Sequence, residues 1–352
     1  MLQSLCTLTK HDDRVWSVGW SWNGDTLYSC GTDKTVRLWR NAPTAANAIE
    51  TTENATTAAW KCSAELSDGH SRTVRCCCFS PCGRYFASAS FDATVVLWEK
   101  SKDGGEWVMK QPLEGHENEV KSVAWSPSGQ YLATASRDKS VWVWEMDEDE
   151  EFQCSSILQN HSQDVKCVRW HPAVDYLVSC GYDDSIRFYG FDGEDWLQCQ
   201  CLESAHSSTV WAVSFDSDGN RLVSAGQDQT LIIWQRFPPS GDTGADPTKG
   251  AWKSVCVIDE GYHDGPIYSV DWCPLTGYIV TGCADNAIRL FRESSKEASD
   301  SPDVTAFDLV QTLATAHAED VNCVRWNPKT PGLLASASDD ATVKLWQLEN
   351  YQ

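Results

Sequence analysis

The sequence predicts an all-β protein built as a seven-bladed β-propeller, and three observations lead to that prediction. One unit recurs seven times along the 352 residues, and each unit contains short runs rich in Val, Trp and Tyr. Gly, Pro and Ser bound these runs, and no helical period lies between them. Four strands per unit, repeated seven times, is the pattern of a propeller. We therefore expect residues 1–352 to form a single domain.

Four positions with fixed spacing mark the repeat. A His precedes the first run of each unit, and an Asp follows it 22 residues later, or 23 in the last unit. A Ser or Thr lies four residues before that Asp, and an aromatic residue lies six after it. The seven tetrads are His11, Ser29, Asp33 and Trp39; His70, Ser88, Asp92 and Trp98; His116, Thr134, Asp138 and Trp144; His161, Ser179, Asp183 and Tyr189; His206, Ser224, Asp228 and Trp234; His263, Thr281, Asp285 and Phe291; and His317, Ser336, Asp340 and Trp346. Agreement at four coupled positions in seven units excludes a chance pattern.

A Ser–His–Asp chain suits nucleophilic hydrolysis, but seven copies, each with an aromatic residue attached, favour a structural role. The aromatic donor can bond to the hydroxyl, the hydroxyl to the His, and the other His nitrogen to the Asp. Such a network makes the loop before the inner strand rigid. Phe291 cannot donate, so we expect a weaker network in the sixth unit. Only His171 lies outside the tetrads, and nucleotide-binding and zinc-helix motifs are missing, so we expect neither an enzyme nor a cofactor.

The ends of the chain predict how the ring closes. Leu2–Leu8 reads as a strand before the first His, whereas the last unit stops soon after Trp346. We therefore expect the N-terminal strand to complete the last blade, which leaves no open sheet edge there. Three connections, at about 40–61, 235–253 and 292–308, are longer than the rest, and we interpret them as mobile surface insertions.

Charge and composition narrow the partners. The formal net charge of −22 argues against direct binding of nucleic acid or of an anionic membrane over the whole surface. No apolar run reaches the roughly 18–20 residues of a bilayer span, and the start lacks the pattern of a secretory signal. We therefore expect a cytoplasmic protein, and a nuclear location is left open.

Sixteen cysteines raise the question of a metal site. Cys76, Cys77 and Cys78 are consecutive, so a strand would place Cys77 on the opposite face from its neighbours. Cys78 and Cys82 have knuckle spacing, but no second knuckle accompanies them. We expect packed thiols in a reducing compartment and no metal.

Two positions per unit are expected at the channel mouth on the side of the tetrad His and Asp. One lies just inside the inner strand and the other directly precedes the tetrad Asp. They are Trp16, Arg75, Lys121, Lys166, Trp211, Tyr268 and Asn322, and then Thr32, Phe91, Arg137, Tyr182, Gln227, Ala284 and Asp339. Four of the fourteen are basic, five aromatic and one acidic, which inverts the composition of the whole chain.

Cationic groups beside aromatic rings suit an anionic peptide, whereas the simpler alternative is solvated cations and ordinary strand aromatics. We predict a partner-binding face formed by Arg137, Arg75, Lys121, Lys166, Phe91, Tyr182, Trp16, Trp211, Tyr268 and Arg14. The acidic run 147–151 is interpreted as a solvated loop, with docking of a basic partner as the alternative.

The repeat resembles the WD40 family along the whole chain, although no Asp follows the terminal aromatic residue in any unit. Gly115–Trp125, Ser136–Glu145 and Ser80–Gly83 closely resemble the WD40 proteins of cytosolic iron–sulfur assembly, the Cia-type targeting scaffolds. The likeness is strongest in units two to four, and the insertion at 40–61 matches nothing in that family.

The resemblance implies a non-catalytic scaffold. Its expected partners are a small iron–sulfur carrier-type subunit, a large helical-repeat adaptor and apo client proteins. The family's exposed arginine of the third blade falls on Arg137. Two other WD40 roles stay open, a ubiquitin-ligase substrate receptor and a histone-tail reader. The first is weakened because no F-box-like helical segment precedes the repeats, and the second because Asp339 is the one acidic residue among the fourteen mouth positions.

Overall fold

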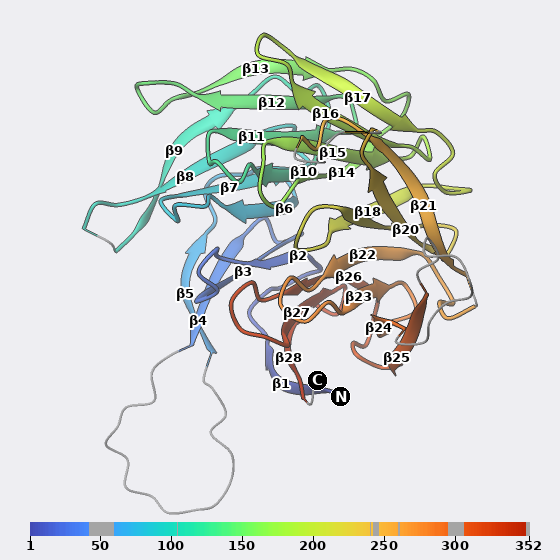
Figure 1. Cartoon of the computed structure of the whole chain (residues 1–352). Helices are drawn as coiled ribbons and strands as arrows, with labels where there is room; N and C mark the ends of the chain where they lie inside the picture. Colours follow the sequence, from blue (N-terminus) through green and yellow to red (C-terminus); the bar gives the residue numbers. More distant parts are fainter. Residues whose placement is uncertain are drawn as a thin grey trace, which may run out of the picture.

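The computed structural model describes residues 1–41, 60–103, 105–239, 241, 246–259, 261–294 and 306–349. These residues form seven four-stranded antiparallel sheets, the blades of a propeller (Figure 1). The all-β, seven-bladed prediction is confirmed. The described residues contain no helix that could cross a bilayer.

Blades one to seven follow the order of the chain, and each begins with its innermost strand. The first three consist of β2 (Val15–Trp20), β3 (Thr26–Gly31), β4 (Val36–Asn41) and β5 (Trp60–Leu66); β6 (Val74–Phe79), β7 (Tyr85–Ser90), β8 (Val95–Lys100) and β9 (Trp107–Leu113); and β10 (Val120–Trp125), β11 (Tyr131–Ser136), β12 (Val141–Met146) and β13 (Phe152–Leu158). Blades four and five consist of β14 (Val165–Trp170), β15 (Tyr176–Gly181), β16 (Ile186–Phe191) and β17 (Trp196–Leu202); and β18 (Val210–Phe215), β19 (Arg221–Gly226), β20 (Leu231–Phe237) and β21 (Ala251–Ile258). The last two consist of β22 (Ile267–Trp272), β23 (Ile279–Cys283), β24 (Ile288–Glu293) and β25 (Phe307–Leu313); and β26 (Val321–Trp326), β27 (Leu333–Ser338), β28 (Val343–Leu348) and β1 (Leu2–Leu8).

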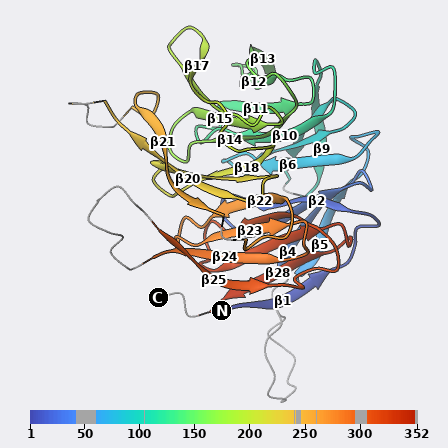
Figure 2. The same ribbon diagram turned by 90° about the vertical axis from the view of Figure 1, so that its right-hand side faces the viewer.

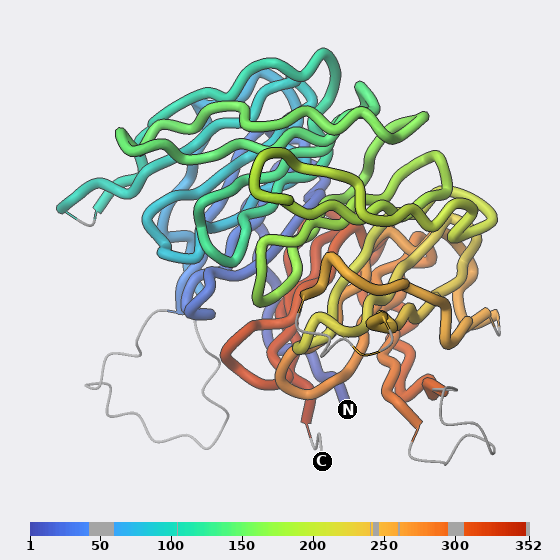
Figure 3. Tube along the Cα trace, turned by 45° about the horizontal axis from the view of Figure 1, so that its top comes forward, coloured from blue at the N-terminus to red at the C-terminus, as the bar shows by residue number. Residues whose placement is uncertain are grey.

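The N-terminal strand closes the last blade, as the sequence predicts. β1 pairs antiparallel with β28, which places Leu2 opposite Leu348 and Leu8 opposite Val343 (Figure 2). The Met1 ammonium also donates to the carbonyl of Glu349 at 2.7 Å. The first and last blades, blue and red in Figure 3, therefore lie side by side and complete the ring.

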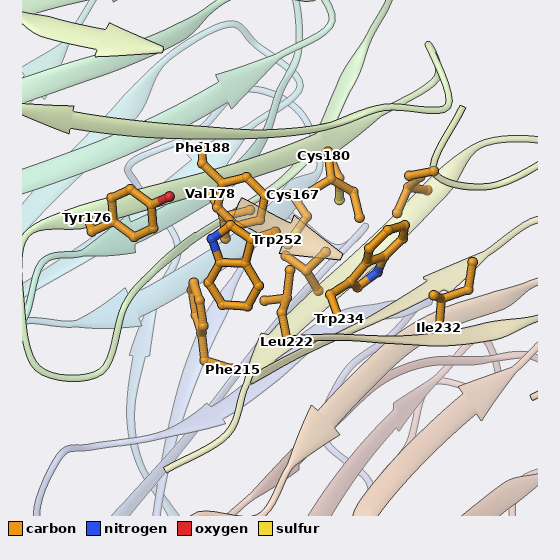
Figure 4. Close-up of a cluster of buried hydrophobic side chains, with 14 residues drawn as sticks. Cys167, Tyr176, Val178, Cys180, Phe188, Phe215, Leu222, Ile232, Trp234 and Trp252 are labelled. Carbon is orange, nitrogen blue, oxygen red and sulfur yellow. The ribbon is translucent and has the colours of Figure 1, made fainter. Parts of the chain in front are cut away.

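The core is divided among the seven interfaces between neighbouring blades. Each of seven buried clusters draws its side chains from two adjacent blades. Between blades four and five, Phe188 stacks on Trp252 with ring centroids 5.0 Å apart, and Phe215 packs against the same indole (Figure 4). Each such large side chain contributes about 1.5–3 kcal/mol by leaving water. The interfaces therefore hold the blades as one ring around the channel.

Eight of the cysteines are buried as expected, whereas Cys82, Cys154 and Cys199 are exposed. All sixteen are free thiols. Cys76 and Cys77 lie on opposite faces of β6, because Cys76 joins the cluster with blade three and Cys77 the cluster with blade one. In the part of the chain that the structure describes, no three His, Cys, Asp or Glu side chains are grouped to hold a metal ion.

The predicted insertions need correction at their ends. Both ends of each insertion belong to strands, namely 40–41 and 60–61, 235–237 and 251–253, and 292–293 and 307–308. The described residues do not include 42–59, 240, 242–245 or 295–305. The mobility of these insertions stays a prediction, but the described parts of 235–253 contact the blades. The buried Arg236 guanidinium donates to the carbonyls of Asp246 and Lys249 at 2.8 and 3.2 Å. Thr248 also packs on Gly190 of blade four, where a Cβ would lie 2.6 Å from its methyl carbon.

Candidate functional site

A buried hydrogen-bonded chain anchors the loop at the channel mouth of blade three. His116 joins the Asp138 carboxylate through Nδ1 at 2.7 Å and the Thr134 hydroxyl through Nε2 at 2.8 Å. Trp144 donates to the same hydroxyl at 3.1 Å. Burial opposes ionisation of Asp138, but the bonds from His116 and Ser140 outweigh it and lower the pKa of Asp138 to about 2. The carboxylate is therefore charged at neutral pH, and it holds the turn that carries Arg137.

Four other blades repeat this geometry with a Trp donor, and blade four repeats it with Tyr189. The His-to-Asp bonds of blades one, two, four, five and seven measure 2.7, 3.1, 2.8, 3.0 and 2.9 Å. In blade four the Ser179 hydroxyl lies 3.3 Å from the Tyr189 oxygen. Each tetrad is buried within its blade, and this arrangement suits a structural support better than an open catalytic centre.

Blade six departs from the pattern. His263 bonds to the Thr281 hydroxyl at 2.9 Å, and Asp285 is instead held by Arg289 at 2.6 and 3.0 Å. Burial, reinforced by the Arg289 charge, lowers the pKa of His263 to about 3. The tetrad of blade six therefore differs in two ways. Phe291 cannot donate to Thr281, and His263 has lost its carboxylate partner Asp285 to Arg289.

A β-bulge in every blade explains the first set of mouth residues. Pairing between the inner strand and the next strand slips after its first residue, for example between Val120 and Ser122. The skipped residues are Trp16, Arg75, Lys121, Lys166, Trp211, Tyr268 and Asn322. A bulge re-aims the side chain of its extra residue, so seven side chains are turned out of the ladder at the same level of the ring.

Five of the predicted residues form one continuous contact across blades three to six. The Lys166 ammonium lies 3.6 Å from the Tyr182 ring centre and 4.7 Å from Trp211. Trp211 meets Tyr182 and Tyr268 edge to face, at 5.9 and 5.1 Å. Lys121 also approaches the Tyr182 ring, at 5.7 Å from its centre. We call these five residues the mouth cluster.

Lys121 and Lys166 of the mouth cluster were expected to present exposed positive charges, and the structure differs for both. Lys121 is only 14% exposed and pairs with Asp164 at 2.7 Å. Burial, together with the neighbouring Lys121 charge, lowers the pKa of Lys166 to about 6. The charged form of Lys166 is therefore disfavoured, because its aromatic surroundings replace water and the adjacent Lys121 ammonium repels a second charge.

A third position per blade contributes to the mouth, and sequence reasoning missed most of it. The residue just before each inner strand accepts a backbone hydrogen bond from the residue before the tetrad Asp, as when Arg137 N donates to Glu119 O at 2.9 Å. These acceptors are Arg14, Thr73, Glu119, Asp164, Thr209, Pro266 and Asp320. Three of them are acidic, so the mouth is mixed in charge rather than basic.

Arg137 and Arg14 are more exposed than the half-buried residues of the mouth cluster. The Arg137 side chain is 55% exposed and contacts the Glu119 carboxylate at 3.3 Å. The same carboxylate also lies 3.5 Å from the Arg72 guanidinium. Arg14 is 54% exposed and pairs with Asp339 at 3.3 Å. Arg137 and Arg14 thus lie on the surface, each beside a carboxylate that a ligand could displace.

Two more predicted residues make contacts of their own at the mouth. Phe91 lies under the Arg72 guanidinium at 6.0 Å. Arg75 lies 4.9 Å from the ring centre of Trp16. The Arg75 charge also acts on Lys166, so its pair with Trp16 adjoins the mouth cluster, whereas Phe91 and Arg72 form a second pair at the mouth.

The acidic run is partly tied to blade two. Arg84 binds Glu150 through both guanidinium nitrogens at 2.6 Å, and Lys110 lies 3.6 Å from Glu151. The Glu150 side chain stays 46% exposed, so the interpretation as a solvated loop stands beside this ion pair. Its role toward a basic partner stays a prediction.

The described residues match the model of the WD domain, G-beta repeat at 2–40, 60–99, 107–145, 152–190, 198–235, 253–292 and 307–347. These segments coincide with the seven blades, so the chain is a WD-repeat β-propeller. It is 44% identical over 353 residues to a protein of Culex quinquefasciatus called probable cytosolic iron-sulfur protein assembly protein Ciao1, which covers 99% of this chain and 98% of the relative. The mouse protein of that name is 48% identical over 119 residues, 32% of this chain and 33% of its own, and the human one is 47% identical over 107 residues, 30% of each. The chain belongs to this family of WD-repeat iron–sulfur assembly proteins.

Proposed function

We propose that the chain is a non-catalytic scaffold of cytosolic iron–sulfur protein assembly and that it binds protein partners at the tetrad side of the channel. The observation that carries this proposal is the 44% identity to the Culex assembly protein, which extends over 99% of the chain and all seven blades. Partial similarity could reflect a generic repeat, whereas agreement over the full ring includes the loops that make one WD40 protein differ from another. The proposed setting is therefore the cytosol.

The geometry supports binding rather than turnover. Ser, His and Asp are joined in six blades, but each hydroxyl is buried and also bonds to the aromatic partner of its own blade, as Thr134 does to Trp144. The tetrads instead fix seven turns at the channel mouth, and exposed arginine and aromatic side chains on rigid turns are common anchors of protein interfaces.

Arg137 is the residue from which we expect the largest contribution to partner binding. Its side chain is 55% exposed, and its contact with the Glu119 carboxylate is long, at 3.3 Å. A carboxylate from a partner can form a paired hydrogen bond with the guanidinium and displace that contact. The other proposed contact residues are Arg14, Arg75, Phe91, Trp16 and the mouth cluster.

The proposed partners follow from the family resemblance. They are a small iron–sulfur carrier-type subunit, a large helical-repeat adaptor and apo client proteins. The mixed charge of the mouth suits partners that bring both signs of charge to different blades, since acidic Asp320 and Asp339 belong to blade seven and Arg75 and Arg137 to blades two and three.

The test is affinity purification of the full chain from cytosol, with co-purifying proteins identified by mass spectrometry. Arg137→Glu is compared with Lys253→Glu, which makes the same change of charge at an exposed position on β21. We expect iron–sulfur enzymes and assembly factors with the natural chain, at least a fivefold depletion with Arg137→Glu, and no depletion with the control. Ligase subunits or histones in their place would overturn the proposal, and equal recovery with both variants would move the binding face elsewhere on the ring.

A further inference from the structure

The channel has a second mouth, at the end where the inner strands finish, and it contains a cavity of about 360 Å³. Its volume falls in the lower part of the roughly 300–1,000 Å³ of small-molecule sites. The tetrads precede the inner strands, so this cavity lies at the opposite end of the channel from the predicted partner-binding face. None of the mouth-cluster residues lines it.

The fifth residue of each inner strand lines the cavity, and most of these residues are small. Blades one, two, three and five contribute Gly19, Cys78, Ala124 and Ser214. Small side chains leave the channel open at this level. At Gly19 the missing side chain makes room for the Tyr28 hydroxyl, which lies 2.1 Å from where a Cβ would be.

The remaining three blades place charged residues at this same level. Blade four contributes Arg169, blade six Asp271 and blade seven Arg325. The Arg169 guanidinium interacts electrostatically with Cys76, Tyr28 and Asp271, which belong to blades two, one and six. Arg169 therefore lines the cavity within electrostatic range of groups on three other blades.

Among the residues that the structure describes, neither arginine forms an ion pair, although the Asp271 carboxylate attracts Arg169 at longer range. Arg169 donates one long hydrogen bond, to the carbonyl of Val168 at 3.4 Å. The recorded bonds of Arg325 all come from Nη1, to the Ser269 hydroxyl and to the carbonyls of Val270 and Val324, at 2.7–3.2 Å. Each guanidinium has five N–H donors, so most of the donor capacity of both is left for a ligand.

The acidic groups of the cavity offset this charge only in part. Asp271 accepts from the Trp326 amide at 2.8 Å and the Ser214 hydroxyl at 3.3 Å, and burial raises its pKa to about 7. Asp216 is paired with Arg221 at 3.1 Å. In a chain of net charge −22, two arginines thus keep positive charge in a recessed site.

We propose that this cavity, defined by Arg169 and Arg325, is a binding site for a carboxylate group. Guanidinium donors match the planar carboxylate, and the low-dielectric walls strengthen the attraction. Two sources can supply this chemistry, a free small dicarboxylic acid and an acidic side chain of a peptide that enters from the open end. The site lies apart from the tetrad side of the channel. If the carboxylate site were disproved, the proposed scaffold function would therefore stand.

The test is isothermal titration calorimetry on the full chain at low ionic strength. Its two probes are succinate and an end-capped Gly-Gly-Asp-Gly-Gly peptide. We expect one of them to bind with a submillimolar Kd and to weaken at least tenfold in Arg169→Gln and in Arg325→Gln. The control Lys329→Gln removes a positive charge from an exposed position near the same end, and we expect less than a twofold change.

The choice of probe identifies the source. Binding of succinate assigns a free acid, and binding of the peptide alone assigns a partner's side chain. No heat from either probe at 10 mM, or equal binding by all variants, would overturn the proposal. If Arg169→Gln does not fold, Arg169→Lys keeps a cation, and a rise in Tm of the natural chain with the probe, absent in Arg325→Gln, serves as the second readout.

Discussion

Blades three and six carry the same His–hydroxyl–Asp–aromatic spacing, yet they connect these residues differently. In blade three, His116 joins Asp138 at 2.7 Å, and a Ser hydroxyl two residues after the Asp bonds to the same carboxylate. In blade six, Ala287 replaces that hydroxyl and Arg289 takes the carboxylate at 2.6 Å. His263 then keeps one hydrogen bond, to Thr281.

The difference teaches that the four marked positions do not determine the network alone. A guanidinium four residues after the Asp can take the carboxylate from the imidazole, because it brings a positive charge and forms two parallel bonds where a neutral imidazole forms one. Arg37 and Arg187 occupy the same position in blades one and four but lie 3.7 and 3.6 Å from their Asp, where Thr35 and Ser185 hold the carboxylate as well. The hydroxyl two residues after the Asp accompanies the His–Asp link in all six of the other blades.

The largest expected effect comes from Asp285→Ala. Arg289 is only 6% exposed, so removing its partner leaves a buried positive charge, which costs about 3–5 kcal/mol of unfolding free energy. Urea unfolding followed by tryptophan fluorescence measures this. The double variant Asp285→Ala/Arg289→Val should recover most of the loss, since Val96 occupies that position in blade two. A double variant as unstable as the single one would show that Arg289 does not dominate blade six.

Asp138→Ala should cost less, about 1–3 kcal/mol, because it leaves neutral donors of His116, Ser140 and Glu117 without an acceptor rather than an unpaired charge. The same unfolding measurement applies. Arg137→Glu, one residue away, provides the control and should leave stability unchanged, since its side chain is exposed. Equal stability of Asp138→Ala and the natural chain would remove the structural account of the tetrads.

The pH dependence of stability tests the isolated His263. Burial and the Arg289 charge lower the pKa of His263 to about 3, whereas in the unfolded chain it is near 6.5. As pH falls from 7 to 5, the unfolded state gains a proton that the folded state excludes, so stability falls by about 1–2 kcal/mol from this residue. His263→Gln should reduce the loss between the two pH values by that amount. An identical pH profile in both proteins would contradict the assignment.

The fold could be predicted because its determinants are local and repeated. The His11-to-Asp33 interval and the alternation in Val15–Trp20 each set a short-range geometry, and seven copies of it leave one way to close the ring. The closing strand followed in the same way, because Leu2–Leu8 had no partner within its own unit.

The site could be predicted only in part, because its charges are set by contacts between segments. Backbone hydrogen bonds to the turns of their own blades place Glu119 and Asp164 at the mouth. No spacing rule in the sequence predicts that Lys121 pairs with Asp164 of the next blade. The cavity at the other mouth did leave a signal. Arg169 and Arg325 are long charged residues at a strand position that elsewhere holds Gly, Cys, Ala, Ser or Asp.

The smallest expected effects come from exchanging the aromatic residues of blades four and six. Tyr189→Phe removes the hydroxyl that lies 3.3 Å from Ser179, and we expect a loss of about 0.5–1.5 kcal/mol. Phe291→Tyr adds a hydroxyl at the equivalent position, where it can reach Thr281. We expect a gain of at most about 1 kcal/mol, because the ring is fully buried and stacked on His263 at 5.8 Å, so the new oxygen must fit without displacing it. Differential urea midpoints measure both changes. If Phe291→Tyr destabilises blade six as much as Tyr189→Phe destabilises blade four, then packing against His263, rather than the missing donor, sets the stability of that blade.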